Sequence, residues 1–274
     1  MTGSGPVPAE REGPPPDIDI SVAHVARVYD YWLGGKTNFT QDQVAARAAM
    51  RAAPHVAEGV RGNRAFLARA VRYLVGEAGV RQFLDIGTGI PAADNTHEVA
   101  QGVAPECRVV YVDNDPIVLA HARALLTSEP GGATAYLDQD LRNVAEIMQA
   151  AAGTLDFTRP AAVMLIGILH CIPDEDDPAG IVKQLMDSVP SGSYLAISHP
   201  ANDINSPGVR RLASRLNELM PMKLRFRSQA EVARFFDGLE LVEPGLVRGP
   251  EWRPDSDADL GNPAAVWAGV ARKN

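Results

Sequence analysis

The sequence predicts an α/β protein with a doubly wound, mostly parallel sheet of seven strands, preceded by an N-terminal helical extension. Three observations predict this fold. From residue 82 onward, short apolar runs alternate with stretches that favour helices. The runs are almost uninterrupted by polar residues, as in strands that helices cover on both faces. The first run ends in a glycine-containing turn, which is typical of sheets that bind ligands at the carboxyl ends of their strands.

The chain before residue 82 differs in composition and in its pattern of apolar residues. Residues 1–19 are rich in Pro, Gly and charged residues, which predicts a disordered tail. An apolar stripe that ends before Gly34 and Gly35 predicts a first helix, and Thr40 to Gln43 form a candidate capping box for a second. A longer helix is expected over about residues 55–77. We therefore expect a tail (1–19), a helical cap or lid (20–80) and an α/β domain (81–274).

The α/β part contains seven candidate strands. They lie at residues 82–86, 108–112, 133–137, 161–168, 193–198, 239–242 and 265–272. Pro91 predicts the start of the first helix, which runs to about residue 103, because proline is favoured in a first helical turn. Asp115 and Pro116 predict the N-cap and first residue of the next helix, and another is expected from Arg142. The last two strands can pair as an antiparallel hairpin at the sheet edge.

The composition excludes several classes of partner. The chain has 274 residues, with 26 Lys and Arg against 34 Asp and Glu, and a formal net charge of -8. Such a chain repels phosphate backbones and anionic lipids, so neither nucleic acid nor membrane is expected as a partner. One stretch, residues 210–227, is locally basic. We interpret it as a solvated helix face followed by a strand; the alternative is a docking patch for an acidic substrate or partner.

The cysteines and the apolar runs indicate a reduced, cytoplasmic protein. Cys107 and Cys171 are too few for a disulfide framework or a metal-ligand cluster, so no metal is expected. The N-terminus lacks the basic and apolar regions of a signal peptide. The longest apolar run, residues 161–169, is far shorter than the roughly 20 residues that a membrane span needs.

The strongest motif is the stretch FLDIGTGIP at residues 83–91. Gly87 and Gly89 carry no Cβ, so a ligand can approach the backbone closely there. The same turn also satisfies the dinucleotide pattern G-x-G-x-x-A, and a tight turn without a ligand is a further alternative. Asp85 argues against a dinucleotide, because its carboxylate would repel a pyrophosphate. The same carboxylate favours a cationic sulfonium ligand that carries an ammonium group. Pro91 also removes an N–H that an anion would use.

Two more acids follow the next two strands. Asp113 ends the second strand, where its carboxylate can accept both hydroxyls of a ribose. Asp140 follows the third strand, where it can accept from an adenine amine or cap the next helix. The alternative for Asp113 alone is a surface acid at a strand end. Together with Asp85, the two acids occupy the carboxyl ends of three consecutive strands, which is where open α/β sheets bind ligands.

On these motifs, residues 82–272 resemble the class I S-adenosylmethionine-dependent methyltransferases. More specifically, the chain resembles an actinobacterial family first catalogued as a domain of unknown function. The matching stretches are ARVYDYWLGGKTNF, FLDIGTGIPAADNTHEVAQ, VVYVDNDPIVLAHARALL, LDQDLR and VMLIGILHCIPDEDDP. The resemblance implies the strand order 3-2-1-4-5-7-6 with the last strand antiparallel. It departs from the general class at Pro91, where many members carry a third glycine.

The resemblance also implies S-adenosylmethionine as cofactor and S-adenosylhomocysteine as its product. It implies that Gly87, Thr88 and Gly89 approach the cofactor, that Asp113 holds the ribose and that Asp140 lies near the adenine. We expect five further residues of the same region to complete the cofactor site, with the Arg64 guanidinium paired to the cofactor carboxylate. The full expected set is Arg64, Asp85, Gly87, Thr88, Gly89, Asp113, Asn114, Asp140, Leu141 and Gly167.

Three residues are candidates for the acceptor side. His170 follows the fourth strand and His199 the fifth, so either can act as a base at the carboxyl edge. The alternative for each is a loop imidazole that bonds to the backbone. Tyr31 lies in an aromatic segment, residues 21–39, which we expect to close over the cofactor as a lid; Tyr31 and Asn38 fall off the apolar stripe and are expected to face the pocket. The alternative is ordinary helix packing on the core.

The sequence therefore predicts a methyltransferase that acts on a small-molecule acceptor of unspecified identity. Two alternatives stay open at this stage. One is a non-catalytic cofactor-binding or regulatory protein on the same fold, because fold does not fix function. The other is a nicotinamide-dependent oxidoreductase, against which Asp85 and the lack of a recognisable Tyr-x-x-x-Lys argue. A homodimer is the one macromolecular assembly that we leave open.

Overall fold

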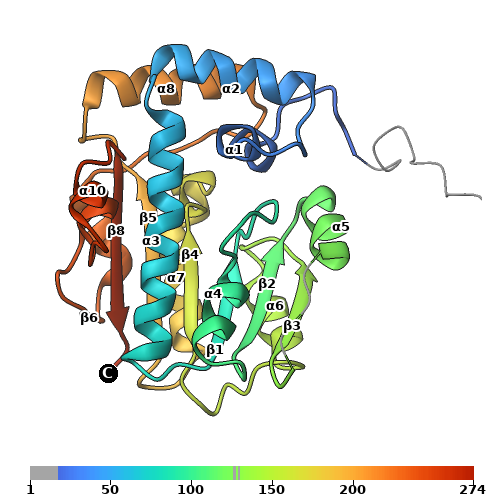
Figure 1. Cartoon of the computed structure of the whole chain (residues 1–274), viewed down its shortest axis with the longest axis vertical. Coiled ribbons are helices and arrows are strands. Elements are labelled where there is room, and N and C mark those ends of the chain that lie inside the picture. Colours follow the sequence, from blue (N-terminus) through green and yellow to red (C-terminus); the bar gives the residue numbers. More distant parts are fainter. Residues whose placement is uncertain (1–17, 126–127, 129) are drawn as a thin grey trace, which may run out of the picture.

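A computed structural model of the chain describes residues 18–125, 128 and 130–274 (Figure 1). Within these residues a single eight-stranded sheet runs in the order β3-β2-β1-β4-β5-β8-β6, with β7 also paired to β8. The strands are β1 (Gln82–Ile86), β2 (Arg108–Asp113), β3 (Ala133–Asp138), β4 (Ala162–Ile166), β5 (Tyr194–Pro200), β6 (Glu240–Leu241), β7 (Val247–Arg248) and β8 (Val266–Arg272). Strands β1 to β5 are parallel and β8 is antiparallel to its neighbours.

This topology confirms the expected α/β fold, including the antiparallel last strand between β5 and β6. The predicted edge pairing of the last two strands is also confirmed, since Leu241 lies opposite Ala271. The sequence gave no sign of the additional strand β7, because two residues are too short a run to show a period. The predicted tail falls almost entirely on residues 1–17, which lie outside the described residues.

The parallel strands are apolar on both faces because helices cover both. All five residues of β1 are buried. Leu84 packs into the core on one face with side chains of the helices α6 (Val144–Ala151) and α7 (Pro178–Asp187). Phe83 packs into the core on the other face with side chains of α3 (Val56–Gly76) and α4 (Thr96–Val103). Neighbouring residues of a strand point to opposite faces, so an uninterrupted apolar run is what such a sheet requires.

Ten α-helices and four short 3₁₀ turns surround the sheet in the described residues. The α-helices are α1 (Val25–Leu33), α2 (Thr40–Ala52), α3 (Val56–Gly76), α4 (Thr96–Val103), α5 (Pro116–Leu125), α6 (Val144–Ala151), α7 (Pro178–Asp187), α8 (Ser206–Leu219), α9 (Gln229–Ala233) and α10 (Asp257–Leu260). The 3₁₀ turns are η1 (Leu169–Cys171), η2 (Asp174–Asp176), η3 (Arg234–Phe236) and η4 (Gly249–Glu251).

Helix starts were predicted well where the cap is local in sequence. Helix α5 begins at Pro116, and the Asp115 carboxylate accepts the Ile117 N–H at 2.9 Å, as expected. The prediction for Pro91 was wrong: α4 begins at Thr96, where Asn95 and Glu98 form the cap. The segment between the glycine turn and α4 is therefore irregular.

Two other helix starts were shifted. Helix α6 begins at Val144 and not at Arg142, and the Asp140 carboxylate accepts the Arg142 N–H at 2.9 Å in a turn before the helix. Helix α2 begins at Thr40, one residue earlier than the predicted capping box requires. Its cap is the side chain of Asp42, which accepts the Phe39 N–H at 2.8 Å.

Helices α1, α2 and α8 form a layer above the carboxyl ends of the strands (Figure 1). Their contacts form a separate apolar cluster that includes Val28, Ala45 and Leu216. Helix α1 ends, as predicted, at Gly34, which has φ +84°. The N-terminal helices thus cover the one edge of the sheet that its flanking helices leave open.

A buried ion pair holds this layer together. The fully buried Asp42 carboxylate accepts the His24 N–H at 2.9 Å and the Phe39 N–H at 2.8 Å, so it joins the start of α1 to the start of α2. The Arg27 Nε lies 3.3 Å from the same carboxylate, and both side chains are almost completely buried. Arg27 also donates to the carbonyls of Asp19 and Val22, which ties down the chain before α1.

We expect Asp42→Ala to lower the free energy of unfolding by about 3–5 kcal/mol, because it leaves the Arg27 guanidinium buried without its counter-ion. Gln41→Ala is the matched control: Gln41 is exposed in the same helical turn, so its loss should cost less than about 0.5 kcal/mol. Urea unfolding followed by circular dichroism measures both. Equal midpoints for the two variants would show that the Asp42 pair does not stabilise the layer.

Candidate active site

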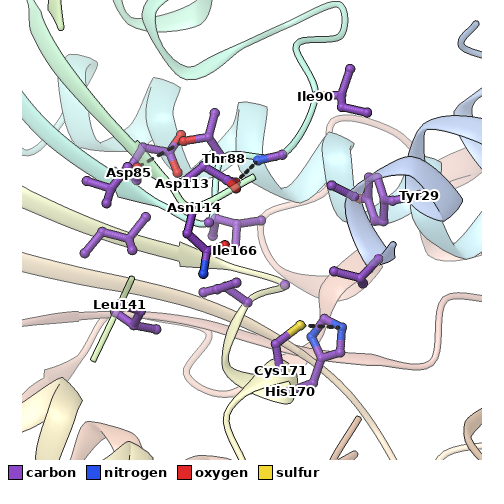
Figure 2. A pocket seen from close by; sticks show the side chains of 18 of the residues that line it. Tyr29, Asp85, Thr88, Ile90, Asp113, Asn114, Leu141, Ile166, His170 and Cys171 are labelled. Atoms are coloured by element: carbon purple, nitrogen blue, oxygen red, sulfur yellow. Dashed lines mark hydrogen bonds between the residues drawn. The ribbon is translucent and has the colours of Figure 1, made fainter. Parts of the chain in front are cut away.

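A cavity opens at the carboxyl ends of β1, β2 and β4, under α1 (Figure 2). We call it the edge cavity. It is lined by all ten residues that the sequence analysis assigned to the cofactor, and also by His170. Figure 2 shows Asp85, Thr88 and Asp113 grouped on one side of it, His170 with Cys171 on another, and Tyr29 approaching from α1. The fold therefore brings together residues that lie more than a hundred positions apart in sequence.

The glycine turn is shaped by two residues in the left-handed region. Gly87 has φ +75° and Gly89 has φ +67°, so side chains would be strained at both. A Cβ at Gly87 would lie 2.4 Å from Cγ1 of Ile168, so the turn packs directly against the loop after β4. A Cβ at Gly89 would meet no atom within 4 Å. Gly89 therefore presents open backbone to the cavity, whereas Gly87 is needed for packing.

Asp113 connects the turns that follow β1 and β2. Its Oδ2 accepts the Gly89 N–H and its Oδ1 accepts the Asp115 N–H, both at 2.9 Å. Burial raises the pKa of the Asp113 carboxyl, and these two backbone hydrogen bonds oppose that shift. A carboxylate oxygen can accept two hydrogen bonds, so each oxygen keeps one free position. Asp113 lines the cavity with its orientation already fixed.

Asp85 lies deeper, at the end of β1. Its side chain is buried, and Oδ2 accepts the Thr96 hydroxyl at 2.6 Å. Burial raises the pKa of the Asp85 carboxyl to about 6; the Thr96 hydrogen bond and the Arg64 guanidinium work against that shift. Thr96 opens α4, and its contact with Asp85 was not foreseen from the sequence. This carboxylate changes charge close to neutral pH.

Asp140 is held as an ionised acceptor at the end of β3. Its Oδ1 accepts from the backbone N–H and from Nε of Arg142, both at 2.9 Å, and its Oδ2 accepts from Asn114 Nδ2 at 3.2 Å. Burial alone would raise the pKa of Asp140, but the hydrogen bonds from Arg142 bring it below its ordinary value. Leu141 adds a buried apolar side chain to the cavity beside this carboxylate.

Arg64 reaches the same cavity from α3. Its Nη2 donates to the carbonyls of Ala93 and Asp94, at 2.9 and 2.8 Å. Its Nε is buried and has no hydrogen-bond partner among the described residues. Arg64 thus holds the irregular segment before α4 against α3 and places a positive charge in the cavity wall.

A second cavity of about 210 Å³ adjoins the first, and we call it the α8 cavity. Helices α1, α3 and α8 and the ends of β5 and β8 supply its walls. Five residues line both cavities: Val25, Tyr29, Asn63, Gly167 and His170. The two spaces therefore share a boundary that consists of α1, α3 and the loop after β4.

His170 lies on this boundary, in the turn η1. It is 8% exposed, and its Nε2 is 3.7 Å from the Cys171 sulfur. Its Nδ1 is buried and has no hydrogen-bond partner among the described residues. Burial, with a contribution from the Arg227 guanidinium, lowers the pKa of His170 to about 4, so the imidazole is neutral at pH 7. One ring nitrogen of this candidate base is thus free.

His199 is not placed where it was expected. It is fully buried and lines neither cavity; Nδ1 is 3.0 Å from the Pro200 carbonyl oxygen and Nε2 is 3.0 Å from Arg227 Nη1. Because a guanidinium only donates, Nε2 accepts and Nδ1 donates. Neither ring nitrogen is therefore free to take a proton from the methyl acceptor. The expectation assumed a strand that ends at residue 198, but β5 continues to Pro200 and pairs His199 with Trp267 of β8.

Arg227 also corrects the interpretation of the basic stretch. Arg210, Arg211 and Arg215 are exposed on α8 as expected, but Arg227 is only 3% exposed. It donates to the carbonyls of Leu169 and Ile172 and forms an ion pair with Asp174 at 2.7 Å. Arg227 thereby fixes the loop that carries His170.

Two aromatic residues of α1 reach the cavities, Tyr29 and Trp32, and Tyr31 is not one of them. The Tyr31 hydroxyl accepts from Arg47 Nε at 3.0 Å, outside both cavities. The Tyr29 hydroxyl accepts from Asn63 Nδ2 at 3.1 Å and donates to the Val60 carbonyl at 3.4 Å. Asn38, also expected to face the pocket, instead donates to Asp30 at 2.8 Å. The apolar stripe correctly indicated which face of α1 points inward. That face lines a cavity, whereas it was expected to pack on the core.

Ser198 is the residue of the second cavity that the sequence analysis missed. Its side chain is fully buried in β5, and Oγ has no hydrogen-bond partner among the described residues. A single hydroxyl at the end of the otherwise apolar run YLAIS was the available signal. In the described part of the chain, no group of three or more His, Cys, Asp or Glu side chains is arranged to hold a metal ion. In the same part, every helix is too short or too polar to cross a membrane.

Comparison with known proteins agrees with this geometry. A family model described as S-adenosyl methyltransferase matches residues 11–274, which includes the N-terminal helices. The crystal structure of a DUF574 family protein from Streptomyces avermitilis MA-4680 is 48% identical, with a TM-score of 0.90 over 93% of this chain and 99% of that chain. A crystal structure from Thermobifida fusca YX, described as a candidate methyltransferase, is 42% identical, with a TM-score of 0.87 over 95% and 98%. A search of curated proteins returns no match.

Both the family model and the two similar structures extend over nearly the whole chain, so the N-terminal helices and the sheet belong to one family architecture. The chain therefore belongs to the S-adenosyl methyltransferase family and is an S-adenosylmethionine-dependent methyltransferase.

Proposed function

We propose that this methyltransferase acts on a small-molecule acceptor, with the cofactor in the edge cavity and the acceptor in the α8 cavity. The observation that carries the proposal is the shared boundary: Tyr29, Asn63, Gly167 and His170 line both spaces. Methyl transfer needs the acceptor atom in line behind the methyl group and close to it. Two adjoining cavities with a common wall meet that requirement.

The residues of the edge cavity fit S-adenosylmethionine. Asp113 keeps one free acceptor position on each oxygen, which suits the two hydroxyls of a ribose. The ionised Asp140 carboxylate, with Asn114 beside it and Leu141 as an apolar contact, suits an adenine and its amine. The open backbone at Gly89 allows close approach, and the Asp85 and Arg64 charges suit the ammonium and carboxylate of the methionine part.

The chain's own residues would orient the acceptor and exclude water. When bound, the cofactor supplies an electrophilic methyl group. Helix α1 covers the carboxyl edge, so the reacting atoms are shielded by Tyr29 and its neighbours, which is the lid role expected for residues 20–80. The free Nδ1 of the neutral His170 can accept a proton from the acceptor as the new bond forms. We do not assign a catalytic role to His199 or Tyr31, since neither lines a cavity.

Two features favour this assignment over the alternatives. The buried Asp85 carboxylate stands where a nicotinamide dinucleotide would place its pyrophosphate, and the two charges would repel. A purely regulatory cofactor-binding protein would not need unpaired polar atoms in a second cavity, which cost free energy unless a ligand pairs with them. The free, buried cysteines accord with the cytoplasmic location that we continue to propose.

The homodimer remains a prediction. Sedimentation equilibrium would test it by measuring the molar mass in solution.

We expect Asp113→Ala to weaken binding of S-adenosylhomocysteine by about ten- to a hundredfold, because hydrogen bonds to a charged acceptor contribute roughly 1.5–3 kcal/mol. Asp138→Ala is the matched control: Asp138 lies opposite Asp113 in the β2–β3 register but is exposed and lines neither cavity. Isothermal calorimetry measures both, with NAD as a ligand expected to give no heat. Equal losses in the two variants would contradict the ribose assignment, and binding of NAD alone would contradict the cofactor site.

The second prediction concerns pH. Below a pKa of about 6 the Asp85 carboxyl is protonated and no longer attracts the ligand's ammonium group. The Kd for S-adenosylhomocysteine should therefore rise about tenfold as pH falls from 7 to 5. Asp85→Asn should bind more weakly at pH 7 and lose most of this slope; any slope that persists reports Asp113, whose pKa is also raised by burial. An unchanged slope in Asp85→Asn would exclude Asp85 as the titrating group.

The third prediction tests α1 as a lid. S-adenosylhomocysteine should slow hydrogen exchange in residues 85–91 and also in α1, because α1 lines the edge cavity. Tyr29→Ala should reduce the protection of α1, since Tyr29 joins α1 to Asn63. Tyr31→Ala should leave it unchanged, since Tyr31 contacts Arg47 instead. Mass spectrometry of exchanged peptides gives the result. Protection confined to residues 85–91 would mean that α1 is ordinary packing.

A further inference from the structure

We infer that the α8 cavity takes a compact, neutral ring compound that carries a hydroxyl group, and that this hydroxyl is the methyl acceptor. The inference deepens the proposed function and rests on it. It is argued from the size of the cavity, from the character of its walls, and from three polar atoms that have no partner within the protein.

The size of the cavity favours a ligand of one or two rings. Its volume is about 210 Å³. For comparison, a dry protein cavity of about 150 Å³ accommodates a benzene molecule. A single ring with substituents or a fused bicyclic system would therefore fit into the space.

The walls are predominantly apolar. Apolar side chains from α1, α8 and the segment after α8 face the space, among them Val28, Trp32, Val209, Leu212, Leu216 and Phe226. Contact with apolar ring surface is favourable in proportion to the area that both partners remove from water. Most of the ligand surface should therefore be hydrocarbon, and the flat ring of Trp32 suits an aromatic or alicyclic ring.

The cavity contains nothing that would compensate an ionised ligand. Among the described residues that line it there is no Asp or Glu, and its one permanently charged residue is Arg211. Arg211 and His55 are both exposed, which places them at the mouth. Burial lowers the pKa of His170 to about 4 and raises the pKa of Tyr29, so both side chains are neutral at pH 7. A buried charge without a counter-ion is strongly unfavourable. A ligand that carries a carboxylate, phosphate or ammonium group inside the cavity is therefore disfavoured.

Three polar atoms on the cofactor side of the cavity lack a partner: Asn63 Oδ1, His170 Nδ1 and Ser198 Oγ. All three side chains are at least nine-tenths buried, with exposures of 7, 8 and 0%. The Asn63 amide orientation is set because Nδ2 donates to the Tyr29 hydroxyl at 3.1 Å, which leaves the oxygen as the free end. Such buried atoms are costly unless they are paired, so each indicates a place for a polar group of the ligand.

Gly167 lies beside two of the residues that carry these atoms, Asn63 and Ser198. Its N–H donates to the Ser198 carbonyl at 3.0 Å, and a Cβ at Gly167 would lie 3.4 Å from Asn63 Nδ2. Asn63 and Ser198 therefore flank Gly167 from α3 and β5, and His170 follows three residues later in η1. Gly167 also lines the edge cavity. A ligand hydroxyl that pairs with these atoms would therefore lie next to the cofactor.

A hydroxyl matches this set better than an ether or a ketone. It can donate to Asn63 Oδ1 or His170 Nδ1 and accept from Ser198 Oγ at the same time. In the His170 tautomer whose Nε2–H points to the Cys171 sulfur, Nδ1 is an acceptor. In the transfer, the hydroxyl oxygen bonds to the methyl carbon, the electron pair of the broken carbon–sulfur bond stays on sulfur, and the hydroxyl proton passes to His170 Nδ1 and then to solvent. The products are a methyl ether and S-adenosylhomocysteine.

Calorimetry on the full chain, saturated with S-adenosylhomocysteine, tests the inference with four naphthalene probes. They are 2-naphthol, its methyl ether, 2-naphthoate and 2-naphthylmethylammonium. We expect 2-naphthol to bind at least tenfold more tightly than either ion, and about three- to tenfold more tightly than the ether, which cannot donate. With S-adenosylmethionine in place of the product, mass spectrometry should detect the methyl ether of 2-naphthol.

Three variants locate the binding. Leu212→Trp fills the cavity from α8 and should abolish 2-naphthol binding, whereas Arg210→Trp, on an exposed face of the same helix, should not. Ser198→Ala should weaken the binding of 2-naphthol and of its methyl ether alike, by about three- to tenfold, because the oxygen of either probe can accept from Oγ. If Leu212→Trp no longer binds S-adenosylhomocysteine, it has misfolded, and the Ser198→Ala comparison decides.

The outcomes separate this inference from the proposed function. Failure of the wild-type chain to bind S-adenosylhomocysteine would overturn the proposed function and this inference with it. Tight product binding with an equal or greater affinity for the charged probes, or an affinity for 2-naphthol that is unchanged in both Leu212→Trp and Ser198→Ala, would overturn the inference alone. In that case the acceptor either is ionic or binds elsewhere.

Discussion

The carboxylate of Asp113 is the contact on which the arrangement of the site depends. It accepts one backbone N–H from the turn after β1, at Gly89, and one from the turn after β2, at Asp115. The Asp115 side chain in turn lies 2.8 Å from His24 Nδ1, just before α1. Through these contacts the half-buried Asp113 sets the position of the glycine turn relative to the neighbouring strand β2, and Asp115 links the turn after β2 to the start of α1. The helix that covers the carboxyl ends of the strands is thus bound to the turns that follow those strands.

The sequence predicted those parts of the fold whose cause is local. Uninterrupted apolar runs identified the strands, and the Asp115–Pro116 pair identified the start of α5, because cap and helix are adjacent. Pro91 gave the wrong helix start because proline is compatible with a first turn but does not create one; Asn95 and Glu98 supply the cap. The residues that line the edge cavity could be predicted because the carboxyl ends of neighbouring parallel strands must meet.

The acceptor side could not be predicted in the same way, because it depends on contacts between distant segments. The end of β5 is set by pairing with β8, almost seventy residues later, and that pairing withdraws His199 from the edge. The apolar periodicity identified the inner face of α1, which includes Tyr29, but it could not show that this face lines a cavity. Tyr31, which lies off that face, was therefore expected in the pocket in place of Tyr29. The role of Arg227, which holds the His170 loop through three carbonyl and carboxylate contacts, requires the three-dimensional fold.

The position of α8 has a consequence for how such enzymes can diversify. Residues of α8 line the cavity assigned to the acceptor, but none of the described residues of α8 lines the one assigned to the cofactor. Substitutions on the inner face of this helix can therefore reshape one compartment while the other keeps its chemistry. Among proteins that share this architecture, substitutions in α8 would change the selectivity for the methyl acceptor. The residues at the strand ends would stay the same. The fold thereby separates what must stay constant from what is free to vary.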